Sequence, residues 1–163
     1  EAFSVDVEMR VFELRAVEWP PMPPGVCRVA DAADLPLVFK WYCDFTREAL
    51  PSDPILPTED GVKRKIEEGS VYLWEDGGPA ALAVRGRRLP HGSSVGPVYT
   101  PPPKRGRGYA SACVATLSQA ILDGGAQFCT LFTDLANPTS NRIYQRLGDR
   151  PLCDFTEYSF HAG

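Results

Sequence analysis

Glycine and arginine alternate in one short stretch of the chain, Arg105-Gly106-Arg107-Gly108. The glycines permit backbone angles, and a close approach of another molecule, that a side chain would block. The guanidinium groups add positive charge suited to phosphate. Because backbone N–H groups and arginine both bind anions, the stretch indicates a phosphate or pyrophosphate cradle. The other reading of the same residues is an ordinary solvated turn.

This turn joins a predicted strand to a predicted helix. The apolar strand, residues 94–100, stops at Pro101–Pro103, because proline cannot continue a ladder of strand hydrogen bonds. Apolar residues then recur at helical spacing from Tyr109 to Ile121, and Gly124 ends the pattern. Such a helix directs its free N-terminal N–H groups and the positive end of its dipole at the turn. The spacing excludes a Walker-type nucleotide loop and a dinucleotide-binding fingerprint.

A second stretch repeats the strand–turn–helix pattern. After an apolar run over residues 128–132, Asn137 is a favourable N-cap, Pro138 suits the first helical position, and Gly148 suits the C-terminus. Tyr144 lies on this helix among apolar neighbours. Taken alone, it is either a core tyrosine or a proton donor.

The first stretch resembles the acyl-CoA loop of the GNAT superfamily of N-acetyltransferases. That loop reads Gln/Arg-x-x-Gly-x-Gly/Ala, and this chain has Arg105-x-x-Gly108-x-Ala110. The resemblance extends over about residues 26–160, and is closest to predicted acetyltransferases whose GNAT module follows another domain. It implies an acyl-CoA N-acyltransferase fold that binds acetyl-CoA.

The second stretch resembles the same superfamily at matching offsets. GNAT enzymes carry an Asn, a small residue at +3, a Tyr at +7 and a Gly at +11, and here these positions are Asn137, Ser140, Tyr144 and Gly148. The family usually continues Gly-Phe, whereas this chain has Asp149 after the glycine. That departure concerns the packing after the helix more than the chemistry.

The predicted fold class is α/β, a central mixed β-sheet with helices on its faces. From residue 26 onward the patterns predict the order β-α-α-β-β-β-α-β-α-β. We expect residues 26–163 to form the acetyltransferase domain. Residues 1–25 read as a strand and a proline-rich linker outside that module, which could be the tail of an upstream domain.

The resemblance implies that an acetyl group is transferred from acetyl-CoA to a primary amine of a small molecule or peptide. Backbone N–H groups of the turn would hold the pyrophosphate with Arg105 and Arg107 as counter-charges, and the strand Gly96–Tyr99 would hold the pantetheine arm. The expected cofactor contacts are Gly96, Pro97, Val98, Tyr99, Arg105, Gly106, Arg107, Gly108, Tyr109, Ala110, Asn137, Ser140 and Tyr144.

The catalytic residues are named from the same resemblance. Tyr144 is the expected general acid for the departing thiolate, whose pKa near 8.5 lies below the value near 10 of a tyrosine. The strand before the turn has no carboxylate, so Asp134 and Glu48 are the candidates for a general base; an amine that arrives desolvated would need none. Tyr42 and Phe45 are candidate acceptor contacts.

Composition narrows the remaining alternatives. The chain has 163 residues and a net charge of −4, which fits one soluble domain and argues against a general nucleic-acid binder. Five cysteines without a Cys-x-x-Cys motif indicate reduced thiols in a cytoplasmic protein, and no metal site, signal peptide or membrane segment is expected. A homodimer is left open. A non-catalytic acyl-CoA-binding sensor module is the alternative to an enzyme.

Overall fold

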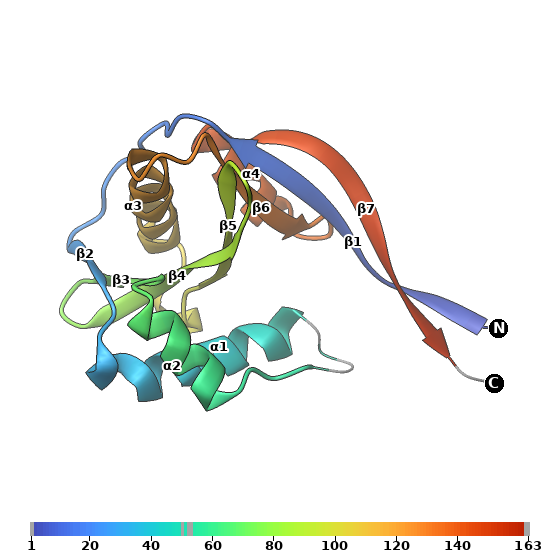
Figure 1. The fold of residues 1–163 in the computed structure, drawn as a ribbon, viewed down its shortest axis with the longest axis horizontal. Coiled ribbons are helices and arrows are strands. Elements are labelled where there is room, and N and C mark those ends of the chain that lie inside the picture. Colours follow the sequence, from blue (N-terminus) through green and yellow to red (C-terminus); the bar gives the residue numbers. More distant parts are fainter. Residues whose placement is uncertain (1, 50, 52–53, 162–163) are drawn as a thin grey trace.

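The computed structural model describes residues 2–49, 51 and 54–161. These residues form the elements drawn in Figure 1. The strands are β1 (Ala2–Leu14), β2 (Val26–Val29), β3 (Val71–Glu75), β4 (Pro79–Arg88), β5 (Gly92–Tyr99), β6 (Phe128–Asp134) and β7 (Arg150–His161). The helices are α1 (Leu35–Ala49), α2 (Glu59–Glu67), α3 (Tyr109–Asp123) and α4 (Pro138–Arg146), with short 3-10 turns at Ala32–Asp34 and Pro102–Lys104.

In the described residues the strands form one seven-stranded sheet in the order β2-β3-β4-β5-β6-β1-β7. β5 and β6 run parallel, and the other neighbouring pairs are antiparallel. The mixed sheet and the predicted order of elements from residue 26 are therefore confirmed. β7 begins at Arg150, earlier than the strand over 155–160 that the sequence pattern indicates.

The expectation that the N-terminal strand lies outside the module is wrong. β1 lies between β6 and β7, and Phe12 stands opposite Leu131 on one side and Pro151 on the other. Phe12 and Leu14 are completely or almost completely buried in the core. β1 therefore connects β7 to the rest of the sheet. An upstream domain stays a prediction.

Helices cover both faces of the sheet (Figure 1). On one face α3 and α4 pack over a core that contains Phe12, Leu117 and Leu131. On the other face α1 and α2 pack over a core that contains Trp41 and Tyr99. None of these described helices is both long and apolar enough to cross a membrane.

β1 and β7 together extend beyond the rest of the sheet as a two-stranded arm (Figure 1). Two aromatic pairs lie exposed on this part of the sheet, Phe3 with Tyr158 and Phe132 with Phe155, with ring centroids 5.6 and 5.8 Å apart. The accessible surface is 9350 Å², against roughly 8,000 Å² for a compact monomer of this mass. Phe3 and Tyr158 are 63% and 47% exposed, so the arm carries exposed apolar side chains.

Candidate functional site

The Gly/Arg turn requires its glycines. Gly106 and Gly108 have φ values of +78° and +81°, in the left-handed region that residues with a side chain rarely adopt. Gly108 is the N-cap of α3, and no side chain caps this helix. The predicted turn from strand to helix is confirmed in its backbone.

The turn leaves backbone donors unpaired. The N–H of Ala112 makes the first bond of α3, to the Gly108 carbonyl at 3.1 Å. The N–H groups of Tyr109, Ala110 and Ser111 therefore precede the helical ladder, as at any helix N-terminus. Within the described residues no acceptor bonds the N–H groups from Gly106 to Ser111. Together with the positive end of the α3 dipole, these donors form a site for an anion.

The two arginines of the turn differ. Arg105 donates from Nε to the Thr100 carbonyl at 2.8 Å and from one terminal nitrogen to both carboxylate oxygens of Glu48 at 3.0 and 2.8 Å. Its guanidinium also lies 5.7 Å from the centre of the Tyr99 ring. These contacts occupy Arg105 and connect the end of α1 to the turn. Arg107 has no ion pair in the described part of the chain and is available as a counter-charge.

Tyr109 fixes the start of α3 to the rest of the fold. Its hydroxyl donates to the carboxylate of Asp76, in the turn between β3 and β4, at 2.5 Å. This bond to a negative group is the main reason why the pKa of Tyr109 is raised. Sequence analysis did not single out Asp76, because 33 residues separate the partners.

β5 and β6 separate next to the turn. Their parallel pairing ends at Val95 opposite Leu131, whereas in the described part of the chain Val98 and Tyr99 pair only with β4, opposite Ala83 and Leu82. The peptide bond between Gly96 and Pro97 is cis. The predicted break in the ladder is confirmed, and it leaves the β6-facing edge of β5 open beyond Val95.

The N-terminus of α4 is anchored to the end of β6. The Asn137 side chain accepts the N–H of Ser140 at 3.1 Å, as its N-cap assignment predicts. The side chain of Asn141 donates to the carbonyls of Asn137 and Asp134 and accepts the Thr133 hydroxyl at 2.5 Å. Sequence analysis missed Asn141; a second polar residue one turn after the N-cap was the available signal.

Tyr144 lies in the core between α4 and the sheet and is 9% exposed. Burial raises the pKa of its hydroxyl well above the usual range, and the negative charge of nearby Asp149 raises it further. Tyr144 is therefore protonated at every ordinary assay pH. The same environment makes it a weaker acid than a solvated tyrosine.

Both candidate bases already have partners. The Glu48 carboxylate is held by Arg105. Asp134, exposed at the end of β6, accepts the N–H of Ala136 at 2.8 Å. Neither has the free carboxylate in a dry environment that a general base prefers.

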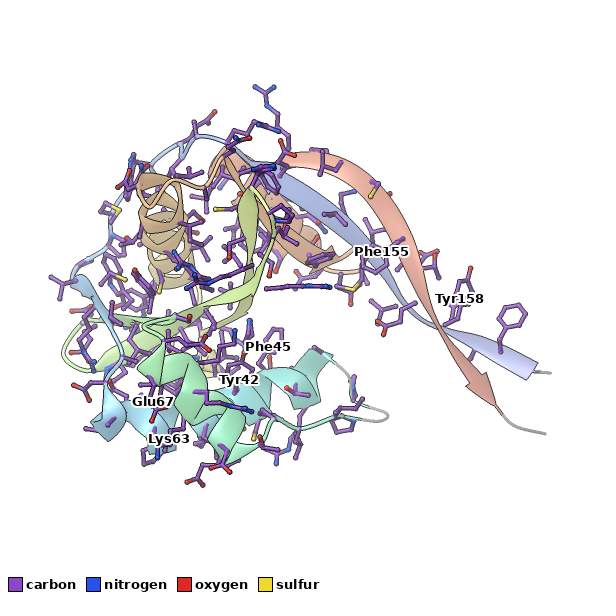
Figure 2. All side chains as sticks on the ribbon, in the orientation of Figure 1. Tyr42, Phe45, Lys63, Glu67, Phe155 and Tyr158 are labelled. Atoms are coloured by element: carbon purple, nitrogen blue, oxygen red, sulfur yellow. The ribbon has the colours of Figure 1, made fainter. Side chains whose placement is uncertain are left out.

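The candidate acceptor contacts Tyr42 and Phe45 lie on α1. Both are half-buried against the core between α1, α2 and the sheet, and Figure 2 shows them on the side of α1 that faces the sheet. Burial raises the pKa of Tyr42 to about 12. The described His, Cys, Asp and Glu residues include no group of three or more that could hold a metal.

Asp149 is a feature whose importance the sequence did not reveal. The residue is 6% exposed, and within residues 2–49, 51 and 54–161 its Oδ2 atom has no hydrogen-bond partner. Burial raises the pKa of this carboxyl to about 7. The backbone N–H of Asp149 donates to the Tyr144 carbonyl at 3.1 Å, so Asp149 follows directly on the C-terminal end of the helix that carries Tyr144.

The sequence of this chain matches a known protein family. Residues 76–158, just over half of the chain, match the model of the FR47-like protein family. No protein of curated function matches the chain in sequence.

Solved structures show the same fold. A GCN5-related N-acetyltransferase from Sphaerobacter thermophilus superposes with a TM-score of 0.72 at 17% identity, over 95% of this chain and 51% of its own. One from Kribbella flavida gives 0.71 at 21% identity, over 99% and 61%. A ribosomal-protein-alanine N-acetyltransferase from Brucella melitensis gives 0.65 at 21%, over 76% and 83%.

This chain spans 51% and 61% of the length of the two GCN5-related N-acetyltransferases. The shared architecture is the GNAT fold, with the central mixed sheet and flanking helices described above. The chain belongs to the FR47-like protein family, and its fold is that of the GNAT N-acetyltransferase structures.

Proposed function

We propose that the protein is an N-acetyltransferase that moves an acetyl group from acetyl-CoA to a primary amine of a small molecule or peptide. One observation carries the proposal: unpaired backbone donors from Gly106 to Ser111 lie beside the open edge of β5 beyond Val95. A pyrophosphate needs the first feature, and an amide-containing arm needs the second.

The residues fit acetyl-CoA in two segments. The N–H groups of the turn would hold the pyrophosphate, with Arg107, which has no carboxylate partner in the described residues, as a counter-charge. The backbone of Val98 would pair with the pantetheine amides, and the amide nitrogen of Asn137 remains to donate, since its side-chain oxygen caps α4. Arg105, the other expected counter-charge, also holds the turn against α1 through Glu48.

In the transfer step, the amine nitrogen bonds to the acetyl carbon, and the bond between that carbon and sulfur breaks. The Tyr144 hydroxyl supplies a proton to the leaving thiolate. The amine must be neutral to attack, and its extra proton passes to solvent or to a carboxylate such as Asp134 or Glu48 after the bond forms. Acetyl-CoA supplies the acyl group, and the protein supplies position and the proton.

A peptide acceptor is one form of this proposal, because the Brucella melitensis structure carries the name of an enzyme acting on a ribosomal protein. A non-catalytic acyl-CoA sensor is the second candidate. The observation that favours the sensor is that both candidate bases are engaged elsewhere. Turnover of any amine would exclude it.

A thermal-shift titration tests the cofactor assignment. Acetyl-CoA and CoA at 100 times Kd should each add roughly 2.7 kcal/mol to the unfolding free energy, whereas NADH should add nothing. Gly108→Ala should weaken both effects, because alanine is strained at φ +81°. Gly69→Ala is the matched control, since Gly69 also has a positive φ with open space around it but lies between α2 and β3. Equal shifts with NADH, or none with CoA, would contradict the proposal.

We also propose a cytoplasmic homodimer that buries the arm of β1 and β7. The surface exceeds that of a compact monomer by roughly 1,300 Å², more than the roughly 800 Å² that one partner buries in a standard interface. Light scattering after size exclusion should give twice 17.9 kDa. Phe155→Glu and Tyr158→Glu should give monomers, and Ile55→Glu, at a site 81% exposed elsewhere, should not. A monomeric wild-type protein would end this proposal.

A further inference from the structure

A cavity of about 310 Å³ lies at the end of α3 that is opposite the Gly/Arg turn. It is bounded by the end of β4, the connection to β5, and the loop between α3 and β6. A helix of 15 residues is roughly 22 Å long, so the cavity is separate from the acyl-CoA site. Its volume is at the lower end of the range for small-molecule pockets, roughly 300–1,000 Å³.

The cavity is lined by two arginines and by no acidic residue. Arg85 and Arg88 line it beside His91, and none of the described residues in its lining is Asp or Glu. In the described part of the chain neither arginine has a carboxylate partner, whereas Arg28 and Arg105 are both ion-paired. Two uncompensated guanidinium groups therefore share one concave surface, and an anion placed there would be attracted to both.

Arg85 shows the imbalance most clearly. Its Nε atom is buried and has no hydrogen-bond partner among the residues that the structure describes. A buried donor without an acceptor costs roughly 1–3 kcal/mol, and such exceptions often mark a ligand, ion or water that the protein binds. The pairing of β4 with β5 shifts register on both sides of Arg85. Bulges of this kind redirect side chains next to functional sites.

The backbone around the cavity offers few competing donors. The N–H groups of Gly124, Gly125, Ala126 and Gln127 all bond protein carbonyls. An anion would therefore be bound by the arginine side chains. The C-terminal end of the α3 dipole carries about half a negative charge and would repel the anion, but the two guanidinium charges outweigh this repulsion. Ile121, also in the lining, adds an apolar wall suited to a carbon skeleton.

We propose that this cavity binds a small organic phosphate through Arg85 and Arg88. Arginine forms paired hydrogen bonds to phosphate oxygens, which would give the buried Nε an acceptor. A phosphate monoester carries nearly two negative charges at neutral pH and so balances two arginines, whereas a carboxylate balances one. The protein then has an anion site beyond its acyl-CoA site, joined to it by the rigid body of α3.

The test uses the full chain with inorganic phosphate and glycerol 3-phosphate as probes, at constant ionic strength and with chloride as the reference anion. At ten times Kd the melting temperature should rise by roughly 4 °C. Arg85→Gln and Arg88→Gln should each remove most of this rise. Arg87→Gln is the matched control, because Arg87 is on the same strand but does not line the cavity.

Amide chemical shifts locate the bound probe, which matters because phosphate could also occupy the Gly/Arg turn. Changes at Gly92, Gly124 and Gly125 that disappear in Arg88→Gln would support the proposal. Changes confined to Gly106 and Gly108, or equal melting shifts in all variants, would overturn it. No response of the wild-type protein to either probe would also overturn it, and would leave water as the partner of the Arg85 Nε.

Discussion

Replacing Tyr144 by phenylalanine should lower kcat by roughly 10²–10⁴-fold while leaving the Kd for CoA unchanged. The ring of Tyr144 stays in the core, because only one oxygen is removed from a side chain that is 9% exposed. What is lost is the proton for the leaving thiolate, and proton transfer by a positioned group contributes a factor of this size. Release of free thiol measures kcat, and calorimetry measures the affinity for CoA.

The control for this variant is Tyr72→Phe, which removes a hydroxyl from a partly buried tyrosine packed against the same core on β3. It should change neither kcat nor affinity. An equal loss of kcat and CoA affinity in Tyr144→Phe would contradict the proton-donor role and point to a packing role. Unchanged kcat would mean that solvent protonates the thiolate.

Local rules were sufficient for the backbone of the site. Proline after the strand and glycine before the helix predicted the turn at Gly106–Gly108, and the structure has positive φ at both glycines. The N-cap at Asn137 was predicted in the same way and is confirmed by its bond to Ser140. These features depend on residues within one turn of each other, so a single sequence contains the information.

Long-range partners were not predictable in this way. Arg105 reads as a phosphate ligand until the structure brings it to Glu48, 57 residues away. The alternation of apolar and polar residues in β1 predicts a strand but does not indicate which strands it pairs with. The sequence alone therefore suggested a strand outside the main sheet. Its place between β6 and β7 is set by burial of Phe12 and Leu14, which only the assembled sheet shows.

Asp149 is the clearest case of a residue whose burial and ionisation could not be predicted from its neighbours in the sequence. In the sequence it is a polar residue after a helix, where exposure is the usual outcome. In the structure it is 6% exposed with an unpaired Oδ2. Burial without a neighbouring cation disfavours the charged form of this carboxyl. The folded state therefore loses stability relative to the unfolded chain at any pH at which the unfolded chain ionises Asp149.

The stability of the protein should therefore fall as the pH rises from about 4 to about 7. The pKa of Asp149 is raised from 3.8 to about 7 in the fold, so between these values the folded state keeps a proton that the unfolded state has released. Each pH unit then lowers the unfolding free energy by about 1.4 kcal/mol, and the whole interval costs roughly 4 kcal/mol. Above pH 7 both states are ionised and this contribution is constant.

Asp149→Asn should remove this dependence, because asparagine keeps the shape and carries no charge. The free energy of unfolding can be measured by urea titration at pH 5, 6, 7 and 8. Relative to the wild-type protein, that of the variant should rise by roughly 2–4 kcal/mol up to pH 7. The rise is smaller than the full effect of the Asp149 charge because the new amide also needs hydrogen-bond partners. Asp154→Asn is the matched control: Arg10 lowers the pKa of Asp154, so this variant should gain nothing as the pH rises. If Asp149→Asn and the wild-type protein kept a constant difference across this range, Asp149 would have to be paired or hydrated in solution.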